Sequence, residues 1–274
     1  MFASHILVTG ASSGIGRGLA LTLAKPGIVL HLGGRNEERF TAVSDACRQR
    51  GAQVFPHLQD VTDREGMEAW VRRAGEPRLD LVLACAGITG AADAQDQEGA
   101  AFESSEQVRR MLAVNLDGAM NTVLPALDIM RAQSRDAHGK RGRICAIASV
   151  AGLVSYPGTP SYSASKAALD RFMVASGAYA RPAGIVLSSV CCGFVDTPMV
   201  AQNRFPMPGL ASTQRAVREI LHGVAREKRR IIFPRWLVLG SRLMDVLPIR
   251  LAEAYYLRQP SGQPGSMAPI HRES

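Results

Sequence analysis

The chain has 274 residues, of which 46% are hydrophobic and 20% are charged. This length and apolar share suit one large globular domain, and the ordinary glycine and proline contents exclude collagen-like and low-complexity chains. The formal net charge of +8 would suit a nucleic-acid-binding protein, but no nucleic-acid motif accompanies it.

The basic character belongs to the last quarter of the chain. Residues 1–203 contain 20 basic and 19 acidic side chains, a balance of +1, whereas residues 204–274 contain 12 and 5, a balance of +7. A basic surface that is merely solvated accounts for this excess, and so does contact with an anionic membrane surface or a partner.

The cysteines and the apolar segments indicate a reducing compartment. The five cysteines have no C-x-x-C spacing and no accompanying histidine cluster, so we expect reduced thiols and neither disulfides nor a metal site. The chain enters an apolar run at residues 5–8 without a basic leader, and no apolar run reaches about 18 residues. The sequence therefore predicts a cytoplasmic protein without a signal peptide or a transmembrane span.

Short apolar runs alternate with longer helical stretches. The expected strands are rich in Val, Ile and Leu and cover residues 6–8, 28–32, 53–56, 79–84, 143–148, 185–190 and 231–233. The expected helices cover 14–24, 36–50, 63–74, 105–132, 161–180 and 213–227, with polar loops at 91–105 and 134–142. This alternation predicts an α/β fold, a single Rossmann-type, doubly wound parallel sheet of about seven strands with helices on both faces.

A glycine-rich turn follows the first expected strand. Gly10, Gly14 and Gly16 form the pattern G-x-x-x-G-x-G between that strand and a helix. Glycines there allow a tight turn and a close approach of the helix N-terminus to a pyrophosphate, and Ser12 and Ser13 add hydroxyl donors. A glycine trio can serve turn geometry alone, but its place between strand and helix predicts a dinucleotide site.

The end of the second expected strand favours NADP over NAD. NAD-binding domains usually place an acidic residue there to hold the ribose hydroxyls, but this chain reads HLGGRN at residues 31–36. The guanidinium of Arg35 matches a 2′-phosphate, and Arg17 beside the glycine turn could add a second charge. Either arginine could instead be a solvated surface residue.

Ser149, Tyr162 and Lys166 form the strongest candidate site. Tyr162 and Lys166 are i, i+4 in an expected helix and so share a face. A free tyrosine has a pKa of about 10. We expect the ammonium of Lys166 to lower it, so that Tyr162 can exchange a proton with a carbonyl or alcohol oxygen. Ser149 follows a strand at the ligand-binding edge, where its hydroxyl can hydrogen-bond the same oxygen. The alternative is a helix that merely exposes a tyrosine and a lysine.

Residues 5–233 resemble the short-chain dehydrogenase/reductase family. Thr9 to Gly16 is similar to the family's T-G-x-x-x-G-x-G, and Ser149, Tyr162 and Lys166 are similar to its Ser…Tyr-x-x-x-Lys. The resemblance adds Asn115 to the catalytic set, where it implies a water that links the lysine to solvent. It implies adenine contacts at Asp60-Val61 and a nicotinamide carboxamide site at Val195 and Thr197. The full set of implied cofactor contacts also includes Tyr162, Lys166, Ile15, Ala86 and Gly87.

The resemblance implies an NADP-dependent oxidoreductase that interconverts a ketone or aldehyde and an alcohol by hydride transfer. Tyr162 would be the general acid/base, the partner a small-molecule carbonyl or alcohol, and the assembly a homodimer or homotetramer. The rival is a catalytically silent dinucleotide-binding protein with a regulatory or scaffold role. The presence of Asn115, Ser149, Tyr162 and Lys166 favours the enzyme, and we expect no metal and no nucleic acid.

Two positions depart from the family pattern. Cys85 stands where the family has the asparagine of Asn-Ala-Gly, which puts a polar contact at that strand end in doubt. Cys192 stands where the family has the proline of Pro-Gly, which adds an N–H and frees a φ angle, so we expect a less rigid loop.

The C-terminal part extends beyond the resemblance. We expect the dehydrogenase domain to cover 1–233, a helical extension packed on it to cover 234–259, and a disordered tail to cover 260–274. Pro248 should divide the extension into two short helices. Residues 228–258 combine apolar and basic side chains, which suits peripheral contact with an anionic membrane, at the inner face of a membrane, as well as packing over the sheet edge or a subunit contact. The loop at 198–208 has two methionines, a phenylalanine and no acid, which favours an apolar or lipid-like substrate.

Overall fold

Seven parallel strands form one sheet in the computed structural model, which describes residues 3–89, 103–155, 159–201, 203 and 206–256. Their order across the sheet is β3-β2-β1-β4-β5-β6-β7. The order reverses between β1 and β4, the point at which doubly wound sheets bind their ligands. The predicted fold class is therefore confirmed. The strands are β1 (His5–Thr9), β2 (Val29–Gly34), β3 (Gln53–Leu58), β4 (Leu81–Ala84), β5 (Gly142–Ile147), β6 (Ile185–Cys192) and β7 (Arg230–Phe233).

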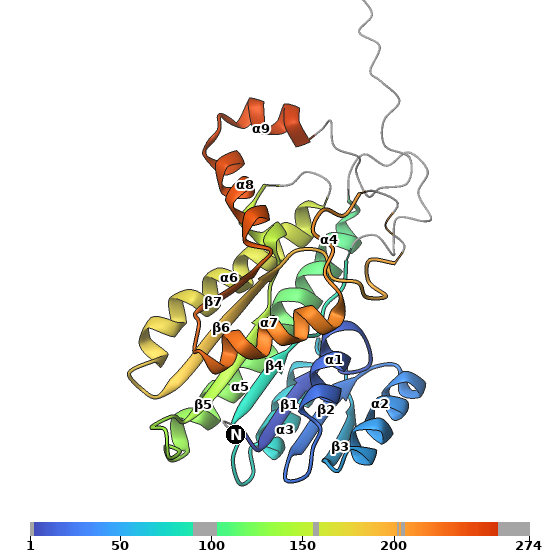
Figure 1. Ribbon diagram of the computed structural model, residues 1–274, viewed down its shortest axis with the longest axis vertical. Coiled ribbons are helices and arrows are strands. Elements are labelled where there is room, and N and C mark those ends of the chain that lie inside the picture. The colour runs from blue at the N-terminus through green and yellow to red at the C-terminus, as the bar shows by residue number, and fades with distance from the viewer. Residues whose placement is uncertain (1–2, 90–102, 156–158, 202, 204–205, 257–274) are drawn as a thin grey trace, which may run out of the picture.

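Helices cover both faces of the sheet (Figure 1). Apolar side chains of α1, α2 and α7 pack on one face, and those of α3, α5 and α6 pack on the other. The helices are α1 (Gly14–Leu23), α2 (Glu37–Gln49), α3 (Arg64–Ala74), α4 (Ser105–Leu112), α5 (Gly118–Ala132), α6 (Pro160–Ala180), α7 (Thr213–Ala225), α8 (Arg235–Val246) and α9 (Ile249–Tyr256).

The strands are buried according to their place in the sheet. Every residue of β5 and β6 is buried, as expected for strands covered on both faces. The edge strand β3 is half exposed and contains Pro56, which an edge strand tolerates because its missing N–H need not pair. Pairing of β3 with β2 continues to Leu58, so this strand is longer than the predicted residues 53–56.

The helix predicted over residues 105–132 is interrupted. A π-helical segment, η3 (Ala113–Asp117), separates α4 from α5. The sequence pattern runs through it without a proline or glycine until Gly118, so periodicity alone shows one helix. The wider turn contains Asn115, and π segments of this kind often occur at functional sites.

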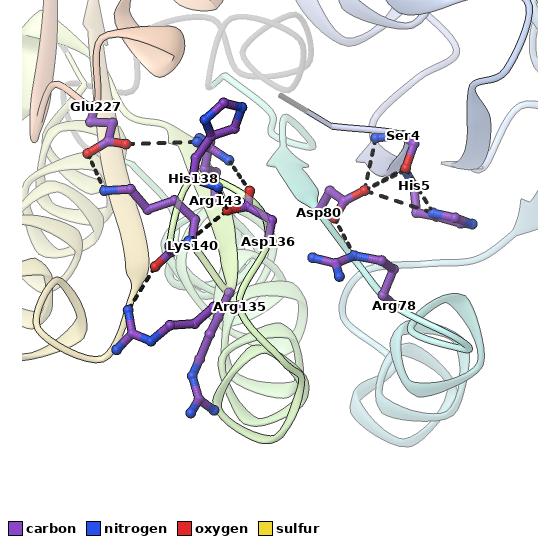
Figure 2. Close-up of polar contacts among 12 residues, drawn as sticks. Ser4, His5, Arg78, Asp80, Arg135, Asp136, His138, Lys140, Arg143 and Glu227 are labelled. Atoms are coloured by element: carbon purple, nitrogen blue, oxygen red, sulfur yellow. Dashed lines mark hydrogen bonds and ion pairs between the residues drawn. The ribbon is translucent and has the colours of Figure 1, made fainter. Parts of the chain in front are cut away.

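Two polar networks join the elements at the amino ends of the strands (Figure 2). The Asp80 carboxylate, just before β4, accepts hydrogen bonds from the backbone N–H groups of Ser4 and His5 and from Nε of Arg78. In the second network, Glu227 pairs with Lys140 at 2.7 Å and reaches the largely buried guanidinium of Arg143 at 3.8 Å. Ion pairs and hydrogen bonds to carboxylates therefore hold the chain segments at this edge of the sheet together.

Pro248 separates α8 from α9, as predicted. Both helices lie beyond the end of the sheet to which the strands point, and α9 lies farther from it (Figure 1). Within the described part of the chain, no helix is both long and apolar enough to cross a bilayer. The predicted tail at 260–274, part of the loop at 198–208, and most of the predicted loop at 91–105 lie outside the described residues.

Candidate active site

The glycine turn between β1 and α1 leaves no room for side chains. Gly10 has a φ of +65°, and a Cβ there would lie 2.8 Å from the backbone nitrogen of Ala86, just after β4. At Gly16, a Cβ would overlap the carbonyl oxygen of Gly10. Ser13 precedes α1, but its side chain does not cap the helix. The turn is therefore a cradle in which the first N–H groups of α1 are available to an anion.

The segment after β6 lies against the same turn. Gly14 has a φ of +52°, and a Cβ there would lie 3.2 Å from Cγ2 of Thr197. The Thr197 hydroxyl donates to the carbonyl of Val195 at 3.2 Å, and buried Val195 pairs with Ala211. Two stretches that are far apart in the sequence are thus brought together, as the predicted cofactor contacts require.

Arg35 and Asp60 form an ion pair at the ends of β2 and β3. Arg35 Nη1 lies 3.1 Å from Asp60 Oδ2, and the two side chains are 52% and 41% exposed. Burial raises the pKa of the Asp60 carboxyl, but hydrogen bonds from Thr62 and Arg35 outweigh it, so the net pKa is lowered. Arg35 and Asp60 were predicted to contact different parts of the cofactor, whereas in the structure they pair with each other.

Ser149, Tyr162 and Lys166 lie together at the carboxyl end of β5. Ser149 begins the 3₁₀ turn η4 (Val150–Leu153), and its Oγ accepts from the N–H of Ala151 at 3.1 Å. Tyr162 and Lys166 share a face of α6, with Lys166 Nζ at 5.8 Å from the Tyr162 ring centroid. Nζ also donates to the carbonyl of Ile147, the last residue of β5, at 2.8 Å. The lysine therefore ties α6 to the strand that leads to Ser149.

Asn115 connects this group to the end of β4. Its side chain is fully buried and exchanges two hydrogen bonds with the backbone of Ile88, at 2.8 and 3.0 Å. Its Nδ2 also lies 3.3 Å from Oγ of Ser165 in α6. A Cβ on Gly87 would lie 3.0 Å from Asn115 Oδ1 and 3.3 Å from Lys166 Nζ. A side chain at position 87 would therefore crowd both groups.

Burial dominates the pKa values of the tyrosine and the lysine. The Tyr162 side chain keeps some exposure, but desolvation of its hydroxyl raises the pKa to about 12, against a hydrogen bond from Ser149 that lowers it. Desolvation lowers the pKa of Lys166 to about 8. The net pKa of Tyr162 is therefore raised in the protein alone, and the expected net lowering is wrong. The reason is that desolvation of the phenol dominates its pKa.

The two departures from the family pattern are accommodated as neutral thiols. Burial raises the pKa of Cys85 to about 12 and that of Cys192 to about 11. The N–H of Cys85 donates to Oγ1 of Thr9 at 3.1 Å, which links the ends of β1 and β4. Cys192 is the last residue of β6 and still pairs with Phe233 of β7, so the strand extends to this position.

Glu103 also supports the site, although no sequence pattern indicates it. Its carboxylate accepts from both the backbone N–H and the hydroxyl of Ser161, each at 2.8 Å. Ser161 precedes Tyr162 in the first turn of α6, and the side chain of the N-cap residue Thr159 makes no capping hydrogen bond. A cap that lies 58 residues away in the sequence leaves no local signal.

No cluster of three or more His, Cys, Asp or Glu side chains that could hold a metal ion occurs among the described residues.

The sequence model described as short chain dehydrogenase matches residues 4–207. The chain belongs to this family. An uncharacterized oxidoreductase of Myxococcus xanthus is 36% identical over 250 residues, 90% of this chain and 94% of the relative. A 3beta-hydroxysteroid dehydrogenase of Mediterraneibacter gnavus is 29% identical over 200 residues, 72% of this short-chain dehydrogenase and 68% of the relative. A solved short-chain dehydrogenase from Sphingobium yanoikuyae, in complex with NADPH, is 25% identical with a TM-score of 0.72, covering 89% of this chain and 96% of that one.

Proposed function

We propose that this short-chain dehydrogenase is an NADP-dependent enzyme that interconverts a ketone or aldehyde and an alcohol. The observation that carries the proposal is the meeting of Ser149, Tyr162 and Lys166 beside the glycine turn. Lys166 lies against Gly87, whose neighbour Ala86 contacts Gly10 of the turn. A reacting oxygen and a dinucleotide would therefore share one edge of the sheet.

The residues at this edge fit a dinucleotide. The glycine cradle would hold the pyrophosphate, Asp60-Val61 the adenine side, and Val195 with Thr197 the carboxamide. Arg35 would hold the 2′-phosphate, and the NADPH complex of the Sphingobium relative supports that choice. When bound, the nicotinamide supplies the hydride for reduction or accepts it in oxidation.

The side chains of the chain itself handle the proton. In reduction, Tyr162 donates its proton to the carbonyl oxygen, and in oxidation the phenolate takes a proton from the alcohol. Ser149 donates a hydrogen bond to the same oxygen, and the Lys166 ammonium stabilises the phenolate that reduction leaves. The hydrogen bonds of Asn115 fix the Gly87 segment relative to α6, which keeps Lys166 in position.

Apolar surface beside the site favours an apolar carbonyl substrate. Met199, Leu210 and Trp236 are 40%, 45% and 58% exposed on the segments that follow β6 and β7. The relative whose name states a steroid substrate points the same way. A homodimer or homotetramer and a cytoplasmic location stay predictions.

The test is NADPH oxidation with a panel of ketones and aldehydes that includes steroid and long-chain carbonyls. We expect turnover with at least one apolar carbonyl, and a rate about 10²–10⁴-fold lower in Tyr162→Phe, which lacks the proton. Calorimetry should show that the variant still binds NADPH. Binding of NADPH without turnover on any carbonyl would favour the silent regulatory or scaffold protein instead.

A further inference from the structure

Helix α8 is fixed to the site through one face. Val238 is buried and clusters with Ala148, Val150 and Leu153, the residues that flank Ser149 on either side. Leu237 packs against the same cluster. The position of α8 is thus set directly by the segment that carries the candidate catalytic serine.

The opposite side of α8 carries exposed apolar side chains among its described residues. Trp236, Leu239 and Val246 are 58%, 74% and 83% exposed. Positions 239 and 246 are seven residues apart and position 236 is one turn earlier, so these three side chains lie on one side of the helix. Val238 and Leu237 lie on the other side. Ile249 and Leu251 of α9 continue the exposed apolar side chains, at 74% and 58%. We call these five residues the α8–α9 surface.

The charge around this surface is positive. Residues 228–258 contain seven basic and two acidic side chains, a balance of +5. Arg230 is neutralised by Asp170 inside the protein, at 2.6 Å. Arg229, Arg235 and Arg250 are exposed. Exposed arginines beside a tryptophan and aliphatic side chains match the headgroups and the outer acyl chains of an anionic bilayer.

The dimensions of the two helices suit a position in the interface plane. They contain 12 and 8 residues, which gives lengths of about 18 and 12 Å. An amphipathic helix in the interface buries its apolar side about 5–10 Å deep, which the exposed side chains of α8 can reach.

We propose that the α8–α9 surface docks on anionic lipid bilayers and turns the substrate side of the site toward the lipid. Because α8 packs beside Ser149 and lies beyond the carboxyl end of the sheet (Figure 1), a docked molecule presents that edge to the membrane. An apolar carbonyl dissolved in the bilayer would then reach the site without crossing water. The second statement rests on the proposed function, whereas the first does not.

The test measures co-sedimentation of the full-length protein with vesicles, without substrate or cofactor. Phosphatidylcholine vesicles are compared with vesicles that also contain phosphatidylglycerol. We expect binding to the anionic vesicles that weakens as salt rises, and at least about tenfold weaker binding in the double variant Leu239→Asp/Val246→Asp. Arg235→Glu should weaken it by roughly fivefold or more.

The control is Tyr179→Asp, which adds one negative charge, half the change in the double variant, at a side chain 89% exposed near the end of α6. It should bind vesicles like the wild type. Absence of wild-type binding to anionic vesicles would overturn the proposal, and so would equal binding by the double variant. A smaller oligomer in the double variant, with no vesicle binding by the wild type, would show instead that a second copy covers this surface.

Turnover of the ketone and aldehyde panel, measured on the same protein samples without vesicles, separates the two proposals. Vesicle binding without turnover would leave docking in place and contradict the proposed function. Turnover without vesicle binding would do the reverse.

Discussion

At the scale of single residues, the candidate site couples one buried lysine to one desolvated phenol. With a pKa of about 12, Tyr162 keeps its proton at any physiological pH and is ready to donate it. With a pKa of about 8, Lys166 is mostly charged below that pH and mostly neutral above it. In the proposed mechanism, the charge that would stabilise the Tyr162 phenolate is therefore the one that titrates closest to neutral pH.

Reduction should slow as the pH rises through about 8. Above that value Lys166 becomes neutral and no longer stabilises the phenolate that forms when Tyr162 gives up its proton. The kcat of NADPH-dependent reduction, measured across neutral and alkaline pH, should show this decline. Lys166→Arg keeps its charge throughout, so whatever activity it retains should not decline there. If kcat declined with the same midpoint pH in the wild type and in Lys166→Arg, a group other than Lys166 would be responsible for the decline.

Arg35 should determine the choice between NADP and NAD. A charge-assisted contact contributes about 1.5–3 kcal/mol, so Arg35→Ala should weaken NADP binding roughly ten- to a hundredfold and leave NAD binding nearly unchanged. Calorimetric titration with both cofactors measures this. Arg48→Ala, at the far end of α2, removes an equally exposed arginine as the control. Equal wild-type affinities for NADP and NAD would contradict the assignment.

The residues that the sequence identified are those with a local pattern. Tyr162 and Lys166 are four residues apart, and the glycines follow a strand directly, so spacing alone predicts their proximity. The pairing of Arg35 with Asp60 joins residues 25 positions apart and exists only because β3 lies beside β2. The pKa of Tyr162 depends on how much protein surrounds its hydroxyl, which no spacing reveals.

At the scale of elements, α6 depends on a cap supplied from outside. The carboxylate of Glu103 takes the place of a local cap at the first turn, one residue before Tyr162. Because Glu103 hydrogen-bonds Ser161 and not Tyr162 itself, it acts as a positioning residue.

Glu103→Ala should loosen the start of α6. We expect a fall of about 1–2 kcal/mol in the free energy of unfolding, as for the loss of an N-cap, and a several-fold fall in kcat with an unchanged KM for NADPH. Denaturant unfolding and steady-state kinetics measure the two effects. Glu103→Gln keeps an acceptor oxygen and should recover part of both. Glu106→Gln, an exposed change in the first turn of α4, is the control. A kcat that is unaffected in Glu103→Ala would show that the cap serves stability alone.

Element boundaries followed from the sequence where the signal was local. Asn36 and Asp63 cap α2 and α3 with their own side chains, and the predicted starts lie within one residue. The break at η3 was missed, because the Asn115 hydrogen bonds at this π segment run to distant Ile88 and Ser165. Strand β4 begins at Leu81 rather than at residue 79. Asp80, just before it, accepts hydrogen bonds from Ser4 and His5 at the start of β1.

At the scale of the whole molecule, chemistry and stability lie at opposite edges of the sheet. The glycine turn and Ser149 follow the carboxyl ends of β1 and β5, and Asn115 hydrogen-bonds Ile88 just after β4. The Asp80 and Glu227 networks join segments that precede β1, β4, β5 and β7 (Figure 2). A change in either network should therefore alter folding without altering turnover.

Asp80→Asn provides the sharpest test of this division. The side chain of Asp80 is 11% exposed, and its carboxylate accepts from Ser4, His5 and Arg78. The isosteric amide removes the charge, and its NH2 group would face an N–H donor where a carboxylate oxygen now accepts. Hydrogen bonds to a charged group contribute about 1.5–3 kcal/mol each, and repacking recovers part of them. We expect a loss of about 2–4 kcal/mol in the free energy of unfolding and an unchanged kcat below the unfolding temperature.

The pH dependence of stability should change in the same variant. Burial raises the pKa of Asp80, but hydrogen bonds from Ser4, His5 and Arg78 outweigh it, so the folded-state pKa is lowered. The stabilisation is therefore present above the unfolded-state pKa of about 4 and is lost as the pH falls through the folded-state value. The wild type should lose stability more steeply than Asp80→Asn in this acid range, as urea unfolding at a series of pH values would show. Asp45→Asn, exposed on α2, should change neither slope nor stability. If the free energy of unfolding of the wild type and of Asp80→Asn fell equally steeply with pH, the stabilising charge would lie elsewhere. If Asp80→Asn lowered kcat under conditions where the variant is fully folded, the two edges of the sheet would be coupled.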